Sequence, residues 1–337
     1  MSGKEKLKIA IGLGATCSGC DMAILDVGEP LLELSNIMDI VFWSTGADLK
    51  LKDFESLPNK SVDFGLYHGT VRTEEQRYVA ELIREKCKYV VAFGTCACFG
   101  GIPALCNLTN RKEIFEVAYK ETPSTVNPDN VFPQEVVEID GKELTLPKLY
   151  NFGYTLDQVI DVDYYVPGCP PPVKLIENLF DAIKEYYATG RLPPKGTVFA
   201  PKKTLCDECP REKPEKISIK KLLSPIEKNP DPNLCLLAQG YLCLGPVTRA
   251  GCGAACPQIG MPCRGCMGPP DNIKDTGAKL ISYIASLIGL DEEAELGEEG
   301  LKKLLSQVKD IVGFGYRFSS SKSIIKDKRG VKSTIKD

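Results

Sequence analysis

The sequence predicts an α/β fold with a doubly wound parallel sheet, followed by a small, irregular and mostly α-helical part. Over the first 190 residues, short apolar segments rich in β-branched and aromatic residues alternate with helical patterns, which is typical of a parallel sheet covered by helices on both faces. Beyond that point the chain is rich in proline, glycine and cysteine. We therefore expect two domains, at residues 1–190 and 191–337.

The expected strands of the first domain are short and buried. They lie at residues 7–14, 39–43, 62–67, 89–93 and 162–166. Helical patterns lie at residues 21–38, 73–86 and 173–188. An Asp-Gly pair at Asp140 and Gly141 is typical of a tight hairpin turn, so we also expect an antiparallel excursion within this domain.

The expected second domain opens with eight prolines between residues 190 and 232, so this segment should be extended. Eight cysteines follow between residues 206 and 266. Because few apolar residues are available there to offset the entropy of folding, a metal centre is the expected stabiliser. Amphipathic helices are predicted at about 275–288 and 297–312. The basic tail, 319–337, should be solvated or contact a partner.

Composition narrows the possible functions. A formal net charge of −3 makes nucleic-acid binding a poor candidate, and no apolar run reaches the ~18 residues of a membrane span. A single histidine, His68, excludes a metal site built on two imidazoles. The first 15 residues lack the pattern of a signal peptide, so we expect a cytoplasmic protein with reduced thiols. Fifteen cysteines then favour metal or cluster binding over disulfides.

Four cysteines of the first domain directly follow predicted strands. Cys17 and Cys20 come after the first strand, and Cys96 and Cys169 come after the two strands that end at residues 93 and 166. The carboxyl ends of parallel strands form the edge at which open α/β sheets bind ligands. The four thiolates can therefore converge on one centre.

The eight cysteines of the second domain form two groups of four. They are Cys206, Cys209, Cys235 and Cys243, followed by Cys252, Cys256, Cys263 and Cys266. Four thiolates suit a 4Fe–4S cluster, but they also suit a structural zinc ion, and spacing alone does not separate the two. The site at the sheet edge favours iron–sulfur, because it is an unusual place for a structural zinc. Cys87, Cys98 and Cys106 are left over and are interpreted as small buried hydrophobic residues.

Several motifs together resemble the small subunit of nickel–iron hydrogenases. In the first domain they are TCSGCD, GTCACFGG and PGCPP. The second domain contains CLGPVTRAGCGAACP and PCRGCMGP, which resemble the cytoplasmic branch of that family. Within this branch, the similarity is greatest to the F420-non-reducing (methyl-viologen-reducing) hydrogenases of methanogens, and sulfhydrogenases come next. The resemblance implies a flavodoxin-like sheet in the first domain.

Carried over residue by residue, the resemblance implies three 4Fe–4S clusters. The proximal cluster would be held by Cys17, Cys20, Cys96 and Cys169, the medial cluster by Cys252, Cys256, Cys263 and Cys266, and the distal cluster by Cys206, Cys209, Cys235 and Cys243. Many relatives have a histidine where this chain has Cys206. A fourth thiolate adds negative charge, which should lower the potential of the distal cluster.

The resemblance implies an electron-transfer subunit that relays electrons from hydrogen oxidation in a nickel–iron large subunit. The expected partners are that large subunit, a small iron–sulfur subunit and heterodisulfide reductase. No catalytic nickel site is expected here, since Met261 stands where the nickel motif needs aspartate. A zinc-stabilised binding or scaffold protein is the competing interpretation. A quinone-reductase small subunit would share the first domain but would lack the eight-cysteine domain.

His68 follows a predicted strand, and the resemblance implies that this position, a glutamate in many relatives, lies close to the proximal cluster. It could tune a cluster or couple a proton to it, but a hydrogen-bonded loop histidine is the favoured interpretation. Glu74 and Glu75 open the next helix, where carboxylates suit the helix dipole without any further role.

Overall fold

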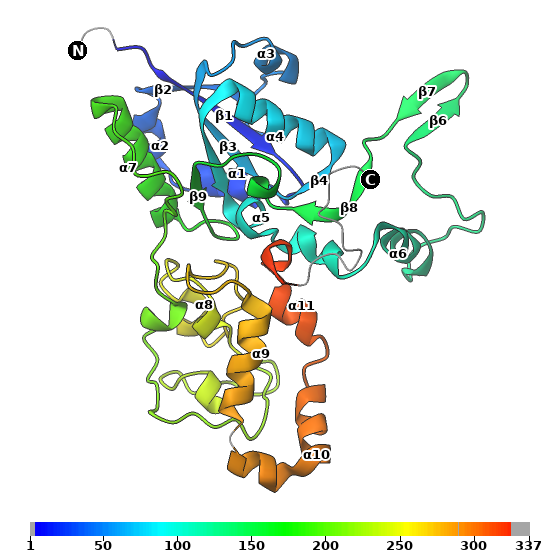
Figure 1. The fold of residues 1–337 in the computed structure, drawn as a ribbon, viewed down its shortest axis with the longest axis vertical. Coiled ribbons are helices and arrows are strands. Elements are labelled where there is room, and N and C mark those ends of the chain that lie inside the picture. The colour runs from blue at the N-terminus through cyan, green and yellow to red at the C-terminus, as the bar shows by residue number, and fades with distance from the viewer. Residues whose placement is uncertain (1–3, 289, 325–337) are drawn as a thin grey trace.

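The computed structural model describes residues 4–288 and 290–324. Two regions lie end to end (Figure 1). The sheet region, residues 4–200, contains the central sheet and its helices, and the cysteine region, residues 201–324, consists of loops and short helices. Within the described residues, no helix is both long and apolar enough to cross a membrane.

The central sheet has five parallel strands. They are β1 (Leu7–Leu13), β2 (Met38–Trp43), β3 (Val62–His68), β5 (Cys87–Phe93) and β9 (Tyr164–Val166). Their order is β2-β1-β3-β5-β9, and every neighbouring pair is parallel. This is the flavodoxin-like, doubly wound order, in which the strand sequence reverses beside β1. The predicted fold class is therefore confirmed.

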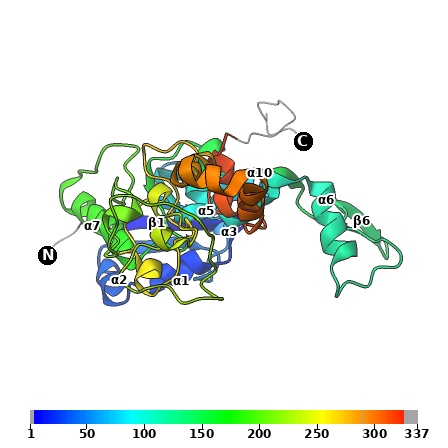
Figure 2. The ribbon, with the colours of Figure 1, turned by 90° about the horizontal axis from the view of Figure 1, so that it is seen from below.

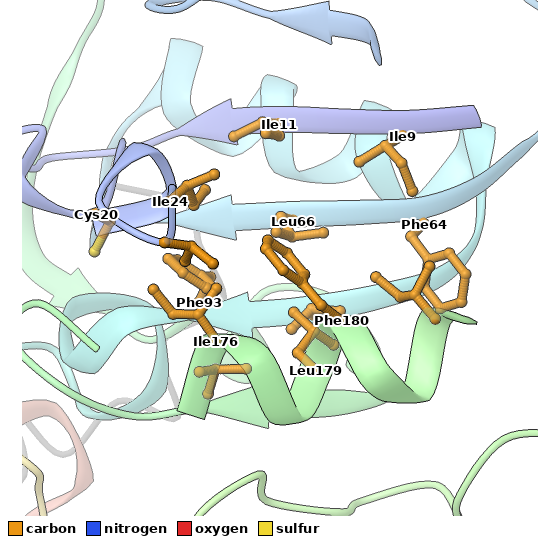
Figure 3. Packing of buried hydrophobic residues seen from close by; sticks show 14 of the residues in the cluster. Ile9, Ile11, Cys20, Ile24, Phe64, Leu66, Phe93, Ile176, Leu179 and Phe180 are labelled. Carbon is orange, nitrogen blue, oxygen red and sulfur yellow. The ribbon is translucent and has the colours of Figure 1, made fainter. Parts of the chain in front are cut away.

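Helices cover both faces of this sheet because alternate residues of its strands are apolar on both sides. Ile9 and Ile11 pack in one cluster against α1 (Gly19–Leu25), α2 (Glu29–Leu34) and α7 (Val173–Thr189). Figure 3 shows this face, with Ile176, Leu179 and Phe180 of α7 pointing toward the strands. The opposite face packs against α3 (Leu51–Glu55), α4 (Glu74–Lys86) and α5 (Gly94–Phe99).

Two predicted helices are each broken in the structure. The single helix expected at 21–38 is wrong: Gly28 has a φ of 72° and separates α1 from α2, and Met38 already belongs to β2. The helix expected at 297–312 is also wrong: its first residue, Gly297, is non-helical within α10 (Leu290–Ser306), and residues 307–310 separate α10 from α11 (Ile311–Tyr316). At Gly28 the break follows from a positive φ, which glycine adopts readily.

An arm projects from the sheet region (Figures 1 and 2). It carries α6 (Arg111–Glu116), a π-helical turn (Val117–Glu121), and the hairpin β6 (Val136–Ile139) and β7 (Lys142–Thr145). The hairpin was predicted from its Asp-Gly turn and is confirmed. A second antiparallel pair, β4 (Val71–Thr73) with β8 (Leu149–Tyr154), was not predicted.

The cysteine region has little regular structure. It contains α8 (Ala255–Gln258), α9 (Thr276–Leu287), α10, α11 and several single 3-10 turns. The helix predicted at 275–288 is confirmed as α9, whose first turn is capped by Asp275, which accepts a hydrogen bond from the Ala278 amide at 2.7 Å. One apolar cluster, which includes Leu205, Leu237 and Leu280, forms its core.

The start of the basic tail is buried, which corrects the expectation of a solvated extension. Ser320 and Ser321 lie against the sheet region, where the Ser320 hydroxyl donates to the Ala104 carbonyl at 2.6 Å and Gln158 donates to the Ser321 carbonyl at 2.8 Å. Their hydroxyls are satisfied by backbone carbonyls, so a polar segment can be buried without penalty. We call residues 319–324 the serine clasp. The rest of the predicted tail, 325–337, lies outside the described residues.

Candidate metal centres

All fifteen cysteines are free thiols, and twelve of them lie in three sets at the positions that the sequence singled out. The three left over, Cys87, Cys98 and Cys106, are buried, as expected for small hydrophobic residues.

The first set lies at the carboxyl edge of the sheet. Cys17 and Cys20 lie where β1 leads into α1, Cys96 lies in α5, and Cys169 lies in the loop after β9. Burial and the neighbouring Cys169 and Cys17 raise the pKa of the Cys96 thiol to about 12. Burial, Cys96, Cys169 and Cys17 likewise raise the pKa of Cys20. The four thiols are therefore close enough to influence one another's charge.

Glycines give these thiols their space. Gly94 has a φ of 81°, and a Cβ at this position would lie 2.4 Å from the Cys20 sulfur. Gly101 has a φ of 58°, and a Cβ there would lie 2.5 Å from the Cys96 sulfur. Only glycine combines a left-handed backbone with this close approach. The backbone of both loops is thus shaped around sulfur atoms.

A buried hydrogen-bonded group lies directly behind the first set. Asp21 follows Cys20 and accepts hydrogen bonds at its Oδ1 from Trp43 at 2.7 Å, with the His68 Nε2 at 3.0 Å from the same oxygen. Burial alone would raise the pKa of Asp21, but the hydrogen bonds from His68 and Trp43 outweigh it and lower the pKa. His68 therefore holds the first turn of α1, which carries Cys20, in agreement with the favoured interpretation of a hydrogen-bonded histidine.

The second set lies in the cysteine region, where Cys243 is buried and Cys206, Cys209 and Cys235 are half-buried. Burial, with contributions from Cys243, Cys235 and Cys209, raises the pKa of the Cys206 thiol to about 12, although Lys213 opposes this. A Cβ on Gly245 would lie 3.1 Å from the Cys206 sulfur and 3.6 Å from the Cys243 sulfur. These four thiols are again brought together around a glycine.

The third set connects the cysteine region to the sheet region. Burial and then Cys252, Cys169 and Cys256 raise the pKa of Cys266 to about 12. The loop that carries Cys252 is held by Glu208, whose carboxylate accepts from the Gly251 amide at 3.0 Å and the Ala254 amide at 3.2 Å.

Hydrogen bonds connect the three sets in sequence. The Cys263 amide donates to the Cys243 sulfur at 3.2 Å, which links the third set to the second. Thr95 links the first set to the third, since its hydroxyl donates to the Cys266 carbonyl and accepts from the Gly168 amide at 3.0 Å, next to Cys169. The third set therefore lies between the first and the second.

Each set offers four thiols to a metal centre. Four thiolates are the donors that a 4Fe–4S cluster takes from a protein, and a structural zinc ion binds the same donors. Among the described residues, no three histidine, cysteine, aspartate or glutamate side chains form a site for a single metal ion. The chemistry of the donor sets therefore fits the 4Fe–4S clusters that the cysteine motifs imply.

Two residues that shape these sites were not found from the sequence. Thr95 lies between Gly94 and Cys96, and Glu208 lies inside the Cys206–Cys209 motif. Both residues are next to predicted ligands in the sequence, and this proximity was the only feature of the sequence that could have indicated their role. Their partners, Cys266 and Gly251, are distant in the sequence, so only the folded chain reveals their roles.

Comparison with known proteins identifies the family. Residues 17–183 match the family model described as NADH ubiquinone oxidoreductase, 20 Kd subunit. The chain is 43% identical to the iron-sulfur subunit of the F420-non-reducing hydrogenase of Archaeoglobus profundus, over 84% of this chain and 88% of that protein. It is 37% identical to the corresponding F420-non-reducing hydrogenase subunit of Methanothermobacter marburgensis, over 95% and 96% of the two chains. The chain belongs to this family of hydrogenase small subunits.

These relatives confirm the resemblance drawn from the cysteine motifs, and with it an oxidoreductase subunit. Membership of the family implies iron–sulfur clusters and a large-subunit partner. The fold agrees as well: a chain of the [NiFeSe]-hydrogenase of Dm. baculatum superposes with a TM-score of 0.50 at 18% identity, over 80% of this chain and 96% of that one. The 20 Kd subunit model covers the sheet region only and ends before the eight cysteines that follow.

Proposed function

We propose that this chain is the electron-transfer subunit of a nickel–iron hydrogenase and holds three 4Fe–4S clusters. The proximal cluster is assigned to Cys17, Cys20, Cys96 and Cys169, the medial cluster to Cys252, Cys256, Cys263 and Cys266, and the distal cluster to Cys206, Cys209, Cys235 and Cys243. When bound, the clusters supply one-electron carriers. The observation that supports the proposal is the succession of three thiol sets, in which the Cys263 amide donates to the Cys243 sulfur and Thr95 joins the loops of Cys169 and Cys266.

The protein contributes burial and hydrogen bonds to the sulfurs, which are the means by which a polypeptide adjusts such centres. Cys243 and Cys263 are both buried, and the Cys263 amide at 3.2 Å and the Gly265 amide at 3.4 Å point to their sulfurs. Cys206 adds a fourth thiolate to the distal set, so its potential should be lower than with a neutral histidine.

The proposed partners follow from the same arrangement. Met22 and Leu25 on α1 are exposed next to Cys17, which is itself exposed. An apolar surface beside a ligand calls for a cover, and we assign this face to the large subunit, with an interface above ~2,000 Å². Beyond the distal set, electrons would leave to a small iron–sulfur subunit and heterodisulfide reductase. We further propose a cytoplasmic location and the domain division at residues 190/191.

Iron analysis tests the proposal. The chain purified without oxygen should be brown and contain about twelve irons, four per cluster. Cys243→Ser should lower the iron content by about four and leave the proximal spectroscopic signal in place. Cys106→Ser is the matched control, because Cys106 is buried but belongs to no set, and its iron content should equal that of the wild type. A colourless chain that contains zinc would support the scaffold interpretation instead.

A further inference from the structure

A cavity of about 620 Å³ lies on the cysteine region, next to the medial and distal sets. Its wall is formed by the segment from Lys221 to Glu227, by the start of α11, and by Leu242, Pro262 and Arg264. Leu242 and Pro262 directly precede Cys243 and Cys263 in the chain. The cavity therefore lies beside Cys243 of the proposed distal set and Cys263 of the proposed medial set.

The cavity is cationic. Lys221, Arg264, Lys309 and Arg317 line it, together with the two acidic residues Glu227 and Asp310. Asp310 is already engaged, since its carboxylate caps α11 and accepts from the Gly313 amide at 2.7 Å. The positive charge of the wall is therefore only partly offset by this chain.

Two arginines share one aromatic ring in this wall. The guanidinium carbons of Arg264 and Arg317 lie 5.1 Å and 6.0 Å from the ring centre of Phe314. Within the described residues, neither guanidinium forms an ion pair with a carboxylate. Thiolates at Cys243, Cys263 and Cys256 would offset part of the charge of Arg264, and Arg317 adds a second positive charge beside it. Like charges held together and partly buried call for an anion.

The rest of the wall is apolar. Leu223, Leu242 and Val308 line the cavity, and the side chain of Ile226, in the adjoining turn, is 94% exposed. A small inorganic anion would leave these groups in water, whereas a peptide that carries both carboxylates and apolar side chains would cover them. The composition of the wall thus favours a protein segment over a free ion.

We propose that this cavity docks a carboxylate-rich segment of the electron-accepting partner protein. This inference rests on the proposed function and adds to it the surface and chemistry by which the acceptor is recognised. Arginines bind carboxylates through paired hydrogen bonds, and charge complementarity at an interface directs both the encounter and the orientation of the partners. The acceptor would thereby be held beside Cys243, one of the residues assigned to the distal cluster.

Cross-linking of the intact complex gives the first test. A carbodiimide joins a lysine amine to a carboxylate with loss of water and adds no spacer atoms. Mass spectrometry of the treated wild-type complex should show amide bonds from Lys221 or Lys309 to aspartate or glutamate of the acceptor subunit. Cross-links from these two lysines only to the large subunit, or to no partner residue, would overturn the proposal.

Charge reversal gives the second test. Arg317→Glu should weaken acceptor binding to the purified hydrogenase at least tenfold at low salt, as measured by isothermal titration of the acceptor subunit. Arg191→Glu is the matched control: it makes the same change of charge on an exposed residue of the sheet region, and its affinity should equal that of the wild type. Equal affinities for Arg317→Glu and Arg191→Glu would contradict the proposal.

A second variant guards against misfolding. Lys309→Glu changes an exposed residue between α10 and α11 that is far in the sequence from every cysteine, and it should weaken binding several-fold. Unchanged affinity in this variant as well would overturn the docking site. Iron content of the wild-type preparation is measured in parallel. An iron-free chain would refute the cluster assignment, while loss of the Lys309 effect in an iron-replete chain would refute only the docking site.

Discussion

The sheet region and the cysteine region reach stability by different means. The sheet region packs two apolar clusters, one on each face of five parallel strands, and its candidate ligands lie at the edge. The cysteine region has one cluster, and Cys243 and Cys263 are themselves members of it. In the first region the fold exists before the site and positions it. In the second, the thiols form part of the interior, so fold and site depend on each other.

Removal of iron should therefore affect the two regions unequally, and this is the largest effect we expect. After anoxic chelation, α9 and the loops around Cys206 should lose amide protection, while β1, β3 and β5 should keep theirs. Hydrogen exchange with mass spectrometry measures both in one experiment. Equal loss of protection in both regions would contradict the comparison.

Core truncation in the sheet region should give the next largest effect. Phe64 is 1% exposed and its ring lies 5.4 Å from that of Tyr89. Phe64→Ala should lower the free energy of unfolding by about 3–5 kcal/mol, because it removes apolar contacts and leaves a cavity. Urea unfolding measures the change. Leu32→Ala is the control, since Leu32 is 71% exposed and should change stability by less than about 0.5 kcal/mol.

Alanine substitution at two glycines distinguishes the cost of a strained backbone from the cost of a clash with a cysteine sulfur. Gly94 and Gly141 both have positive φ, but a Cβ would meet the Cys20 sulfur at Gly94 and nothing within 4 Å at Gly141. Gly94→Ala should lower the iron content by about four per chain. Gly141→Ala should retain all iron and lose about 1–2 kcal/mol of stability. Equal iron content in the two variants would show that the Gly94 loop does not depend on its glycine.

Loss of a helix cap should have a smaller effect. Thr73 accepts from the Gln76 amide at 3.2 Å, and Gln76 bonds back to the Thr73 amide at 3.1 Å, which forms a capping box at the start of α4. Thr73→Ala should cost about 1 kcal/mol in thermal or urea unfolding. Thr73→Ser retains the hydroxyl, so its stability should be close to that of the wild type. Equal stability of Thr73→Ser and Thr73→Ala would show that the cap does not stabilise this end of α4.

The buried thiol of the sheet region should show the smallest effect. Burial raises the pKa of Cys87 to about 12, so at pH 8 the group stays protonated. Since the thiolate is the nucleophile, iodoacetamide should not modify Cys87 in the native protein and should do so after unfolding. Peptide mass spectrometry distinguishes the two states. Rapid labelling at pH 8 would show that Cys87 is accessible.

The sequence was most informative where one physical signal dominates. The strands were predicted within a few residues because buried parallel strands are continuous apolar runs, and Cys96 and Cys169 were located because they follow such runs. Helix breaks were missed where a glycine ends an apolar pattern, as at Gly28. Pattern alone does not distinguish such a glycine from one that a helix tolerates.

Features that depend on distant partners could not be predicted. The serine clasp is polar and basic in sequence, which usually indicates a solvated tail, and its burial depends on carbonyls of Ala104 and Gly153. Glu208 holds the loop of Cys252 through amides some 43 positions away in the sequence.

The serine clasp has a mechanical consequence. The polypeptide passes from the sheet region to the cysteine region once, near residue 200, and Ser320 and Ser321 bring it back to the starting side. The cysteine region is thus connected to the sheet region at both of its ends, by the chain near residue 200 and by the serine clasp. A hinge motion between the two regions would have to break the hydrogen bonds of the serine clasp. Cys169 and Cys266 are therefore kept in register, so, if they hold the two clusters proposed above, the tethers also fix the separation on which the rate of electron tunnelling would depend.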